Sequence, residues 1–146
     1  MAYSSKFSTS IHILLAIVRF EKEEKQTSIN LADSINVNPV IIRNLLQKLK
    51  KADLIYVKSG VGGAYLNKSP NDFSLFDIFK AVEDTDKDVF KKHENPNVDC
   101  PVGQVVHAVV NPNFDKIKED LFTSLKSIPF QKLVNEMYEN LDKTKL

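Results

Sequence analysis

The chain has 146 residues, enough for one ordinary hydrophobic core or for a small domain with an appended helical arm. One cysteine excludes an intramolecular disulfide framework, and no apolar run approaches the roughly 20 residues that a membrane span requires. The net charge of +1 conceals an asymmetry: residues 1–70 hold ten Lys or Arg and five Asp or Glu, whereas residues 71–146 hold ten Lys or Arg and fourteen Asp or Glu. The basic first half predicts a polyanionic partner.

The first predicted element is a helix over residues 7–20. Its buried stripe is predicted from four apolar residues at helical spacing: Ile11, Leu14, Leu15 and Val18. The preceding segment lacks the apolar core of a secretory signal, so we expect a cytoplasmic protein without membrane association. Lys6 stands next to the start of this helix, where its side chain can contact a phosphate of a polyanionic partner.

Residues 28–35 and 39–52 are predicted to form two helices around a short turn. Ser28 is the expected N-cap of the first helix. Asn38 is the expected N-cap of the second, and Pro39 suits its first position because the missing N–H costs nothing there. A short helix, a tight turn and a longer helix in this order are typical of a helix-turn-helix.

The second of these helices has an apolar face and a cationic face. The apolar face is predicted from Ile42, Leu45, Leu46 and Leu49. The other face carries side-chain types that contact phosphates and base edges in a major groove: Arg43, Asn44, Gln47, Lys50 and Lys51. A basic amphipathic helix taken alone is more often a solvated surface than a DNA reader, so the order of the elements carries the prediction.

Two short strands are predicted at residues 54–57 and 64–66, with a glycine-rich turn between them. A hairpin in this place predicts a winged helix-turn-helix, whose wing touches the DNA backbone or minor groove. The glycines could instead cradle a phosphate, but neither Gly-Lys-Ser/Thr nor a helical pattern follows them, which argues against a P-loop.

The predicted DNA-binding surface combines both helices, the wing and the start of the chain. Arg43 and Gln47 are expected to face bases, and the lysines with Ser28 and Asn38 to lie nearer phosphates. The predicted set is Lys6, Ser28, Asn38, Pro39, Val40, Arg43, Asn44, Gln47, Lys48, Lys50, Lys51, Lys58, Ser59, Gly60 and Gly62. Neither catalysis, a metal nor a cofactor is predicted, because no nucleophile has a base at a recognisable spacing and His12, His93 and His107 are scattered along the chain.

The second half of the chain is predicted to be helical around one long loop. Ser74 and Asp77 form a capping-box pattern at the start of a short helix, and the charged residues 84–99 form a loop that is either functional or disordered. Cys100-Pro101 starts a helix that carries Val102, Val105, Val106 and Val109. Asn111-Pro112 is expected to interrupt it, Ile128-Pro129 to end the next helix, and a last helix to follow.

A dimer interface is predicted in this half. Four apolar residues step by three, four and four, close to a heptad seam: Phe114, Ile117, Leu121 and Leu125. Helix-turn-helix proteins usually bind DNA as two-fold dimers, which favours a homodimer over burial of these helices within one monomer. The expected organisation is a winged helix-turn-helix domain over 1–83, a loop over 84–99, and dimerisation and C-terminal helices over 100–146.

These residues together resemble the Rrf2 family of bacterial winged-helix regulators, and most closely its single-cysteine YwnA-like branch. The matching features are Thr27-Ser28 with Leu31-Ala32, Asn38-Pro39 with Arg43, Leu49 with Lys51-Ala52, Gly62-Gly63 with Leu66, residues 74–78 with Ala81-Val82, Cys100-Pro101-Val102-Gly103, and Ile128-Pro129-Phe130. The resemblance implies a homodimeric transcription regulator with a mainly α fold, a β-hairpin wing and a long dimerisation helix, which binds double-stranded DNA.

The chain departs from the family pattern in three places. Cluster-binding members carry three cysteines before the dimer helix, whereas only Cys100 stands here, so the usual iron–sulfur cluster is not expected. Asp53 replaces a frequent glycine at the end of the recognition helix, where aspartate can adopt the left-handed conformation at modest cost. The wing lacks the arginine common in the family, and Lys58 is its nearest cation.

Three functional hypotheses follow. The first is a repressor that reads a pseudo-palindromic operator. The second adds redox sensing through Cys100, because the N-terminus of a helix favours a thiolate, although a lone cysteine before an apolar helix is more often simply buried. The alternative is a regulatory interaction module that docks on a metabolic enzyme through residues 84–99 and reports a small-molecule signal.

Overall fold

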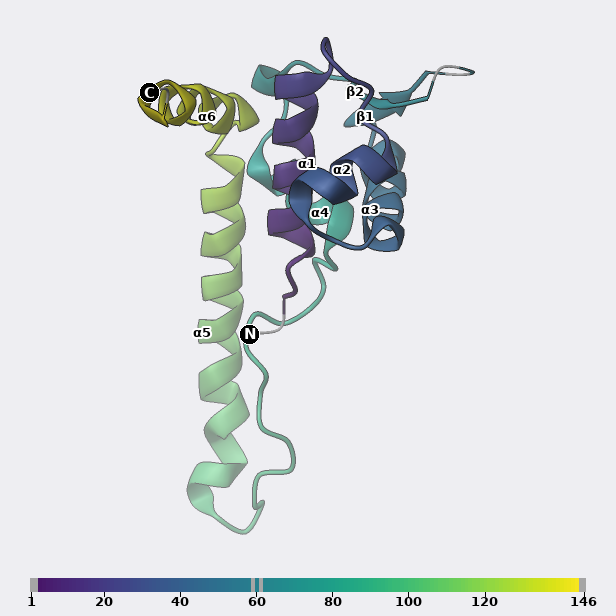
Figure 1. Ribbon diagram of the computed structural model, residues 1–146. Coiled ribbons are helices and arrows are strands. Elements are labelled where there is room, and N and C mark those ends of the chain that lie inside the picture. The colour runs from purple at the N-terminus through teal and green to yellow at the C-terminus, as the bar shows by residue number, and fades with distance from the viewer. Residues whose placement is uncertain (1–2, 59, 61, 145–146) are drawn as a thin grey trace.

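The computed structural model describes residues 3–58, 60 and 62–144. Its elements are α1 (Lys6–Phe20), α2 (Ser28–Ile35), α3 (Pro39–Lys51), β1 (Ile55–Val57), β2 (Ala64–Leu66), the 3-10 helix η1 (Pro70–Asp72), α4 (Leu75–Val82), α5 (Pro101–Lys126) and α6 (Phe130–Thr144). The first four helices and the hairpin form one body, α5 stands beside it as a long rod, and α6 lies across its upper end (Figure 1). This is the predicted mainly α fold with a β-hairpin wing.

Local capping residues fix the two helices of the helix-turn-helix. Asn38 caps α3 as predicted, because its Oδ1 accepts a hydrogen bond from the Val40 N–H at 2.8 Å and Pro39 occupies the first helical position. The prediction for α2 was wrong by one residue. Thr27 is its N-cap and accepts from the Asn30 N–H at 3.2 Å, so Ser28 is the first residue of the helix.

The wing is a two-stranded antiparallel hairpin that pairs Ile55 with Leu66 and Val57 with Ala64. Strand β1 begins at Ile55 rather than Leu54, which is buried just before it. Asp53, between α3 and β1, has φ +61°, the left-handed conformation predicted for the end of the recognition helix.

Helix α1 lies at the centre of the core and contacts α2, α3, α4, α6 and β2. Its most buried side chains are Ile13, Leu14 and Ile17, whereas the other members of the predicted stripe are only half-buried: Ile11, Leu15 and Val18. Most of the predicted stripe was therefore displaced to the edge of the buried face. Periodicity alone locates one packed face, but α1 has neighbours on several sides.

Helix α5 runs unbroken through Pro112, so the predicted interruption at Asn111-Pro112 was wrong. A proline inside a helix removes one backbone hydrogen bond and crowds the preceding turn. Here the Asn113 side-chain amide donates to the Val109 carbonyl at 2.8 Å, which adds a local hydrogen bond on the affected turn. The helix therefore continues for 26 residues and forms the rod in Figure 1.

Phe130, the first residue of α6, anchors this helix to the body. It is fully buried, its ring stacks on Phe73 at 5.0 Å, and its N–H donates to the Phe73 carbonyl at 2.9 Å. The Leu75 N–H donates to the Ile128 carbonyl nearby, at the start of α4. Ser74 opens α4 with the predicted capping box to Asp77.

Within the described ranges, no helix is both long and apolar enough to cross a membrane.

Candidate nucleic-acid interface

Helix α3 presents its polar face to solvent because its opposite face is anchored in the core. Ile42, Leu45 and Leu49 are buried, as predicted. At 3.6 residues per turn, the line directly opposite them consists of Val40, Asn44, Gln47 and Lys51, and all four are exposed. Arg43 and Lys50 flank this line on one side, and Ile41 and Lys48 on the other.

One flank of α3 meets the start of the chain. A hollow of about 430 Å³ is lined by Lys6, Ile41, Asn44, Leu45, Gln47, Lys48 and Lys51. The fold thus brings Lys6, which is remote in sequence, beside the cationic residues of α3. Three ammonium groups and two carboxamides around one hollow form a surface suited to phosphates and base edges.

The other flank of α3 meets the wing and the start of α2. A hollow of about 270 Å³ is lined by Gln26, Thr27, Ser28, Arg43, Leu46, Gln47, Val57, Gly63 and Ala64. Ser28 therefore joins Arg43 and Gln47 at this site, although it does not cap the helix. The Ala64 N–H donates to the Gln26 carbonyl at 2.9 Å, which fixes the base of the wing against the turn before α2.

The wing carries one cation held by an aromatic pair. The Lys58 ammonium lies 4.6 Å from the centroid of the Tyr65 ring, which in turn stacks on Tyr56. Gly60 and Gly62 have φ of +76° and +77°, a conformation that L side chains rarely adopt, so the turn depends on glycine there. Ser59, predicted to contact DNA, lies outside the described residues.

The structure adds Lys80, which the sequence prediction missed. A hollow at the end of α3 is lined by Lys48, Lys51, Ala52, Lys80 and Ala81, so α4 extends the cationic surface. Only the packing of α4 on α3 brings Lys80 there, and no local pattern signals it. Lys80 also pairs with Asp77 at 3.7 Å, whereas no side chain of α3 takes part in an ion pair among the described residues.

Cys100 and two histidines are the potential metal-binding side chains at the N-terminal end of α5. Cys100 is exposed at the N-cap of α5, and no group of three or more His, Cys, Asp or Glu in the described ranges could hold a metal ion. His93 and His107 are brought together with ring centroids 5.7 Å apart, which corrects their interpretation as scattered residues. One thiol without thiolate companions does not fit an iron–sulfur cluster.

Three of the four predicted dimer residues pack within their own chain. Leu125 is buried, Leu121 packs against the core, and the Phe114 ring lies 5.4 Å from that of Phe90 in the loop after α4. Ile117 alone of the four is exposed, at 43%. For these three side chains the structure favours burial within the monomer.

A second apolar line runs along the N-terminal half of α5 on another face. Val102, Val105 and Val109 are 68%, 51% and 60% exposed. The side of α5 that faces residues 84–99 is different: Gly103 lies against Asn97 and His107 against His93. A Cβ on Gly103 would come 2.1 Å from the Asn97 carbonyl oxygen, so glycine is required for this close approach.

Comparisons with known proteins agree with this fold and surface. Residues 3–136 match the family model described as Rrf2, iron-dependent transcriptional regulator. YwnA of Bacillus subtilis (strain 168), named as an HTH-type transcriptional regulator, is 36% identical over 135 residues, 92% of this chain and 98% of YwnA. A solved structure described as a DNA-binding protein is 32% identical with a TM-score of 0.69, covering 88% of this chain and 98% of its own.

A more distant solved structure, IscR of T. potens, has the same fold at 18% identity, with a TM-score of 0.69 over 96% of this chain and 90% of its own. The family match spans most of the chain, and the single cysteine does not supply the thiolate set that holds an iron–sulfur cluster. The chain belongs to the Rrf2 family of transcriptional regulators.

Proposed function

We propose that the protein binds a specific DNA sequence by inserting α3 into the major groove, with the wing beside the backbone. The observation that carries this proposal is the outer line of α3, where Asn44, Gln47 and Lys51 are exposed and where Lys51 takes part in no ion pair among the described residues. YwnA and the 32% identical structure are described as a helix-turn-helix regulator and a DNA-binding protein, which supports the same reading. Residues 1–83 would be the DNA-binding domain.

The position of each side chain determines whether it would contact a base or a phosphate. Arg43 and Gln47 lie beside each other at the wing side of α3 and would read base edges, Arg43 by a forked contact to guanine and Gln47 by a paired contact to adenine. The surrounding cations would contact phosphates: Lys6, Lys48, Lys50, Lys51, Lys58 and Lys80. Blocking access of polymerase at such a site would make the protein a repressor.

A second part of the proposal is a two-fold dimer joined through α5. The exposed line of Val102, Val105 and Val109 has no role in the folded monomer, because the chain's own loop covers a different side of the helix. Two copies related by a two-fold axis can bury these lines against each other. Each copy would then present α3 to one half-site, and the half-sites would lie about one helical turn apart.

Selection of bound fragments from genomic DNA tests the proposal. We expect the purified protein to enrich fragments that share a pseudo-palindromic motif, since each copy would read the same half-site. Enrichment without any shared motif would contradict sequence-specific binding, and a motif with a single half-site would contradict the two-fold dimer.

A redox response of this regulator would depend on Cys100. Its thiol is exposed at the N-cap of α5, two residues before Val102 in the sequence. A hydroperoxide would oxidise the thiol to a sulfenic acid, with the peroxide reduced and water or an alcohol released. The modification would add a polar group at the end of the dimer line and weaken pairing of the two copies.

We therefore expect peroxide treatment to lower the affinity of the reduced protein for its selected fragment, and the Cys100→Ser variant to be insensitive. The DNA affinity of both proteins is measured by titration before and after peroxide treatment. A dithiol is then added to the treated proteins, and the affinity is measured again. Equal affinity for reduced, oxidised and Cys100→Ser protein would leave Cys100 without a sensing role.

A further inference from the structure

Val40 is the one apolar residue on the outer line of α3. It is 52% exposed in the first turn of the helix and lies opposite the buried residues Ile42 and Leu49. The other members of the line are polar: Asn44, Gln47 and Lys51. A β-branched side chain at an exposed helical position does not improve helix propensity, so the fold of the monomer does not explain a valine there.

The surroundings of Val40 decide what kind of partner can cover it. Lys6, Lys48 and Lys51 border the hollow on one side of α3, and Arg43 lies on the other. This cationic surface is complementary to a polyanion, and it is continuous with the face of α3 proposed to enter the major groove. An apolar side chain in the first turn of a recognition helix faces base edges, because the N-terminal residues of such a helix approach them.

The apolar group that a base pair presents in the major groove is the C5 methyl of thymine. Asn44 follows Val40 by one turn on the same line, and its carboxamide has the geometry for the N6 and N7 atoms of adenine. We propose that Val40 determines specificity by packing on a thymine methyl in each half-site, next to an A·T pair contacted by Asn44. This inference rests on the proposed function and adds the base that α3 selects.

Deoxyuridine tests it, because this base lacks only the methyl group of thymine. Thymines of the selected fragment are replaced one at a time by deoxyuridine, and the affinity of the full chain is measured by fluorescence anisotropy. We expect one position in each half-site to lose about fourfold in affinity, the effect of one buried methyl group. In Val40→Ala, the preference for thymine over deoxyuridine at that position should fall well below fourfold, because both γ-methyl groups are removed.

Two further variants separate the contact from a general loss of binding. Lys51→Ala should weaken binding to both fragments and keep the fourfold preference for thymine, because it removes a phosphate contact. Val40→Thr keeps one methyl group and the β-branched shape, so it should retain part of the preference. Circular dichroism of Val40→Ala should match the wild-type spectrum, since the residue is exposed.

The outcomes distinguish this inference from the proposed function. Failure to select any shared motif would contradict sequence-specific binding itself. A selected motif in which no thymine responds to deoxyuridine, or in which the response survives unchanged in Val40→Ala, would overturn the role of Val40 and leave α3 as the reading helix.

Discussion

Replacing Arg43, Gln47 and Lys51 together by alanine is expected to lower affinity for the selected fragment at least about 100-fold, to the level of random DNA. Each well-formed contact between a side chain and a base edge is worth about 1–3 kcal/mol, so the loss of two base readers removes most of the discrimination. Loss of Lys51 should also reduce the slope of log K against log salt by about 0.9 for each copy of the chain that binds, as expected for one phosphate contact per copy. Titration at several salt concentrations measures both effects.

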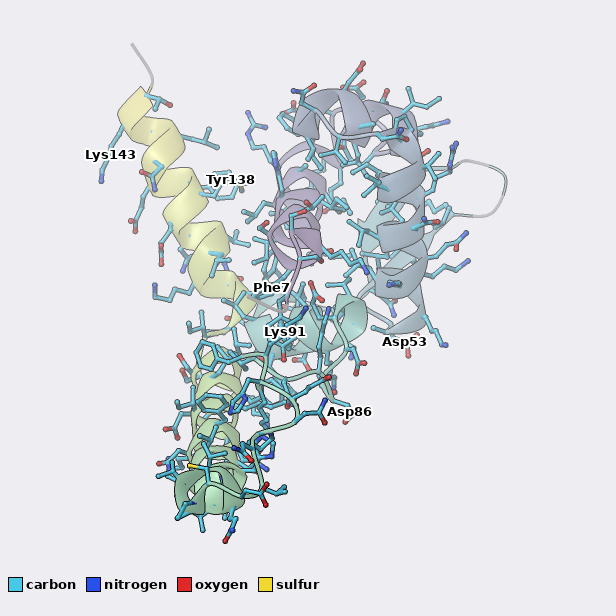
Figure 2. The ribbon with its side chains drawn as sticks, turned by 90° about the horizontal axis from the view of Figure 1, so that it is seen from below. Phe7, Asp53, Asp86, Lys91, Tyr138 and Lys143 are labelled. Carbon is cyan, nitrogen blue, oxygen red and sulfur yellow. The ribbon has the colours of Figure 1, made fainter. Side chains whose placement is uncertain are left out.

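The matched control lies on α6. Gln131→Ala/Lys132→Ala/Lys143→Ala removes the same number of cations and carboxamides as the triple variant of α3. Lys143 and Tyr138 extend from α6 on the far side of α1 from Asp53, which marks the end of α3 (Figure 2). We expect this control to bind with nearly wild-type affinity. If the wild type and the α3 variant bind the selected fragment with equal affinity, the DNA contacts another surface of the protein.

Replacing Val102 and Val109 by glutamate is expected to raise the dissociation constant of the dimer by at least about 100-fold. Each buried valine contributes roughly 1.5 kcal/mol or more to association, and paired glutamates add repulsion and a desolvation cost. Because both side chains are exposed in the monomer, the fold should be retained. Sedimentation equilibrium measures the dissociation constant, and circular dichroism checks the fold.

Asn135→Glu/Asn140→Glu adds the same charge on α6 and serves as the control for the dimer. This control should remain a dimer with unchanged DNA affinity. The valine variant, in contrast, should bind the full operator no more tightly than it binds a fragment with a single half-site. A wild-type protein that sediments as a monomer at every concentration would contradict the dimer. So would a valine variant that dimerises as well as the wild type.

Local sequence signals predicted the bounds and the buried face of α3 well. Asn38 and Pro39 define its start, Asp53 its left-handed end, and the spacing of Ile42 and Leu49 its buried face, because each depends on neighbours within a few residues. These short-range features also determine which side of α3 meets solvent. The candidate DNA-binding face could therefore be predicted before the fold was known.

Contacts between distant segments could not be predicted from local patterns. Lys80 joins the cationic surface only because α4 packs on α3, and no periodicity within α4 predicts that neighbour. The heptad spacing at Leu121 and Leu125 correctly indicates a packed face, but the partner is the chain's own body. The prediction at Pro112 failed for a local feature: Asn111-Pro112 was expected to interrupt the helix because of the local cost of proline, but α5 runs unbroken through it.

Photocrosslinking from α3 tests most directly whether this helix meets duplex DNA. With p-benzoylphenylalanine in place of Asn44, irradiation of the complex with the selected fragment should attach the protein to DNA, whereas the same group in place of Tyr138 on α6 should not. Both positions are exposed, so the difference reports proximity to DNA rather than burial. A covalent product from position 138 and none from position 44 would contradict insertion of α3 into the major groove.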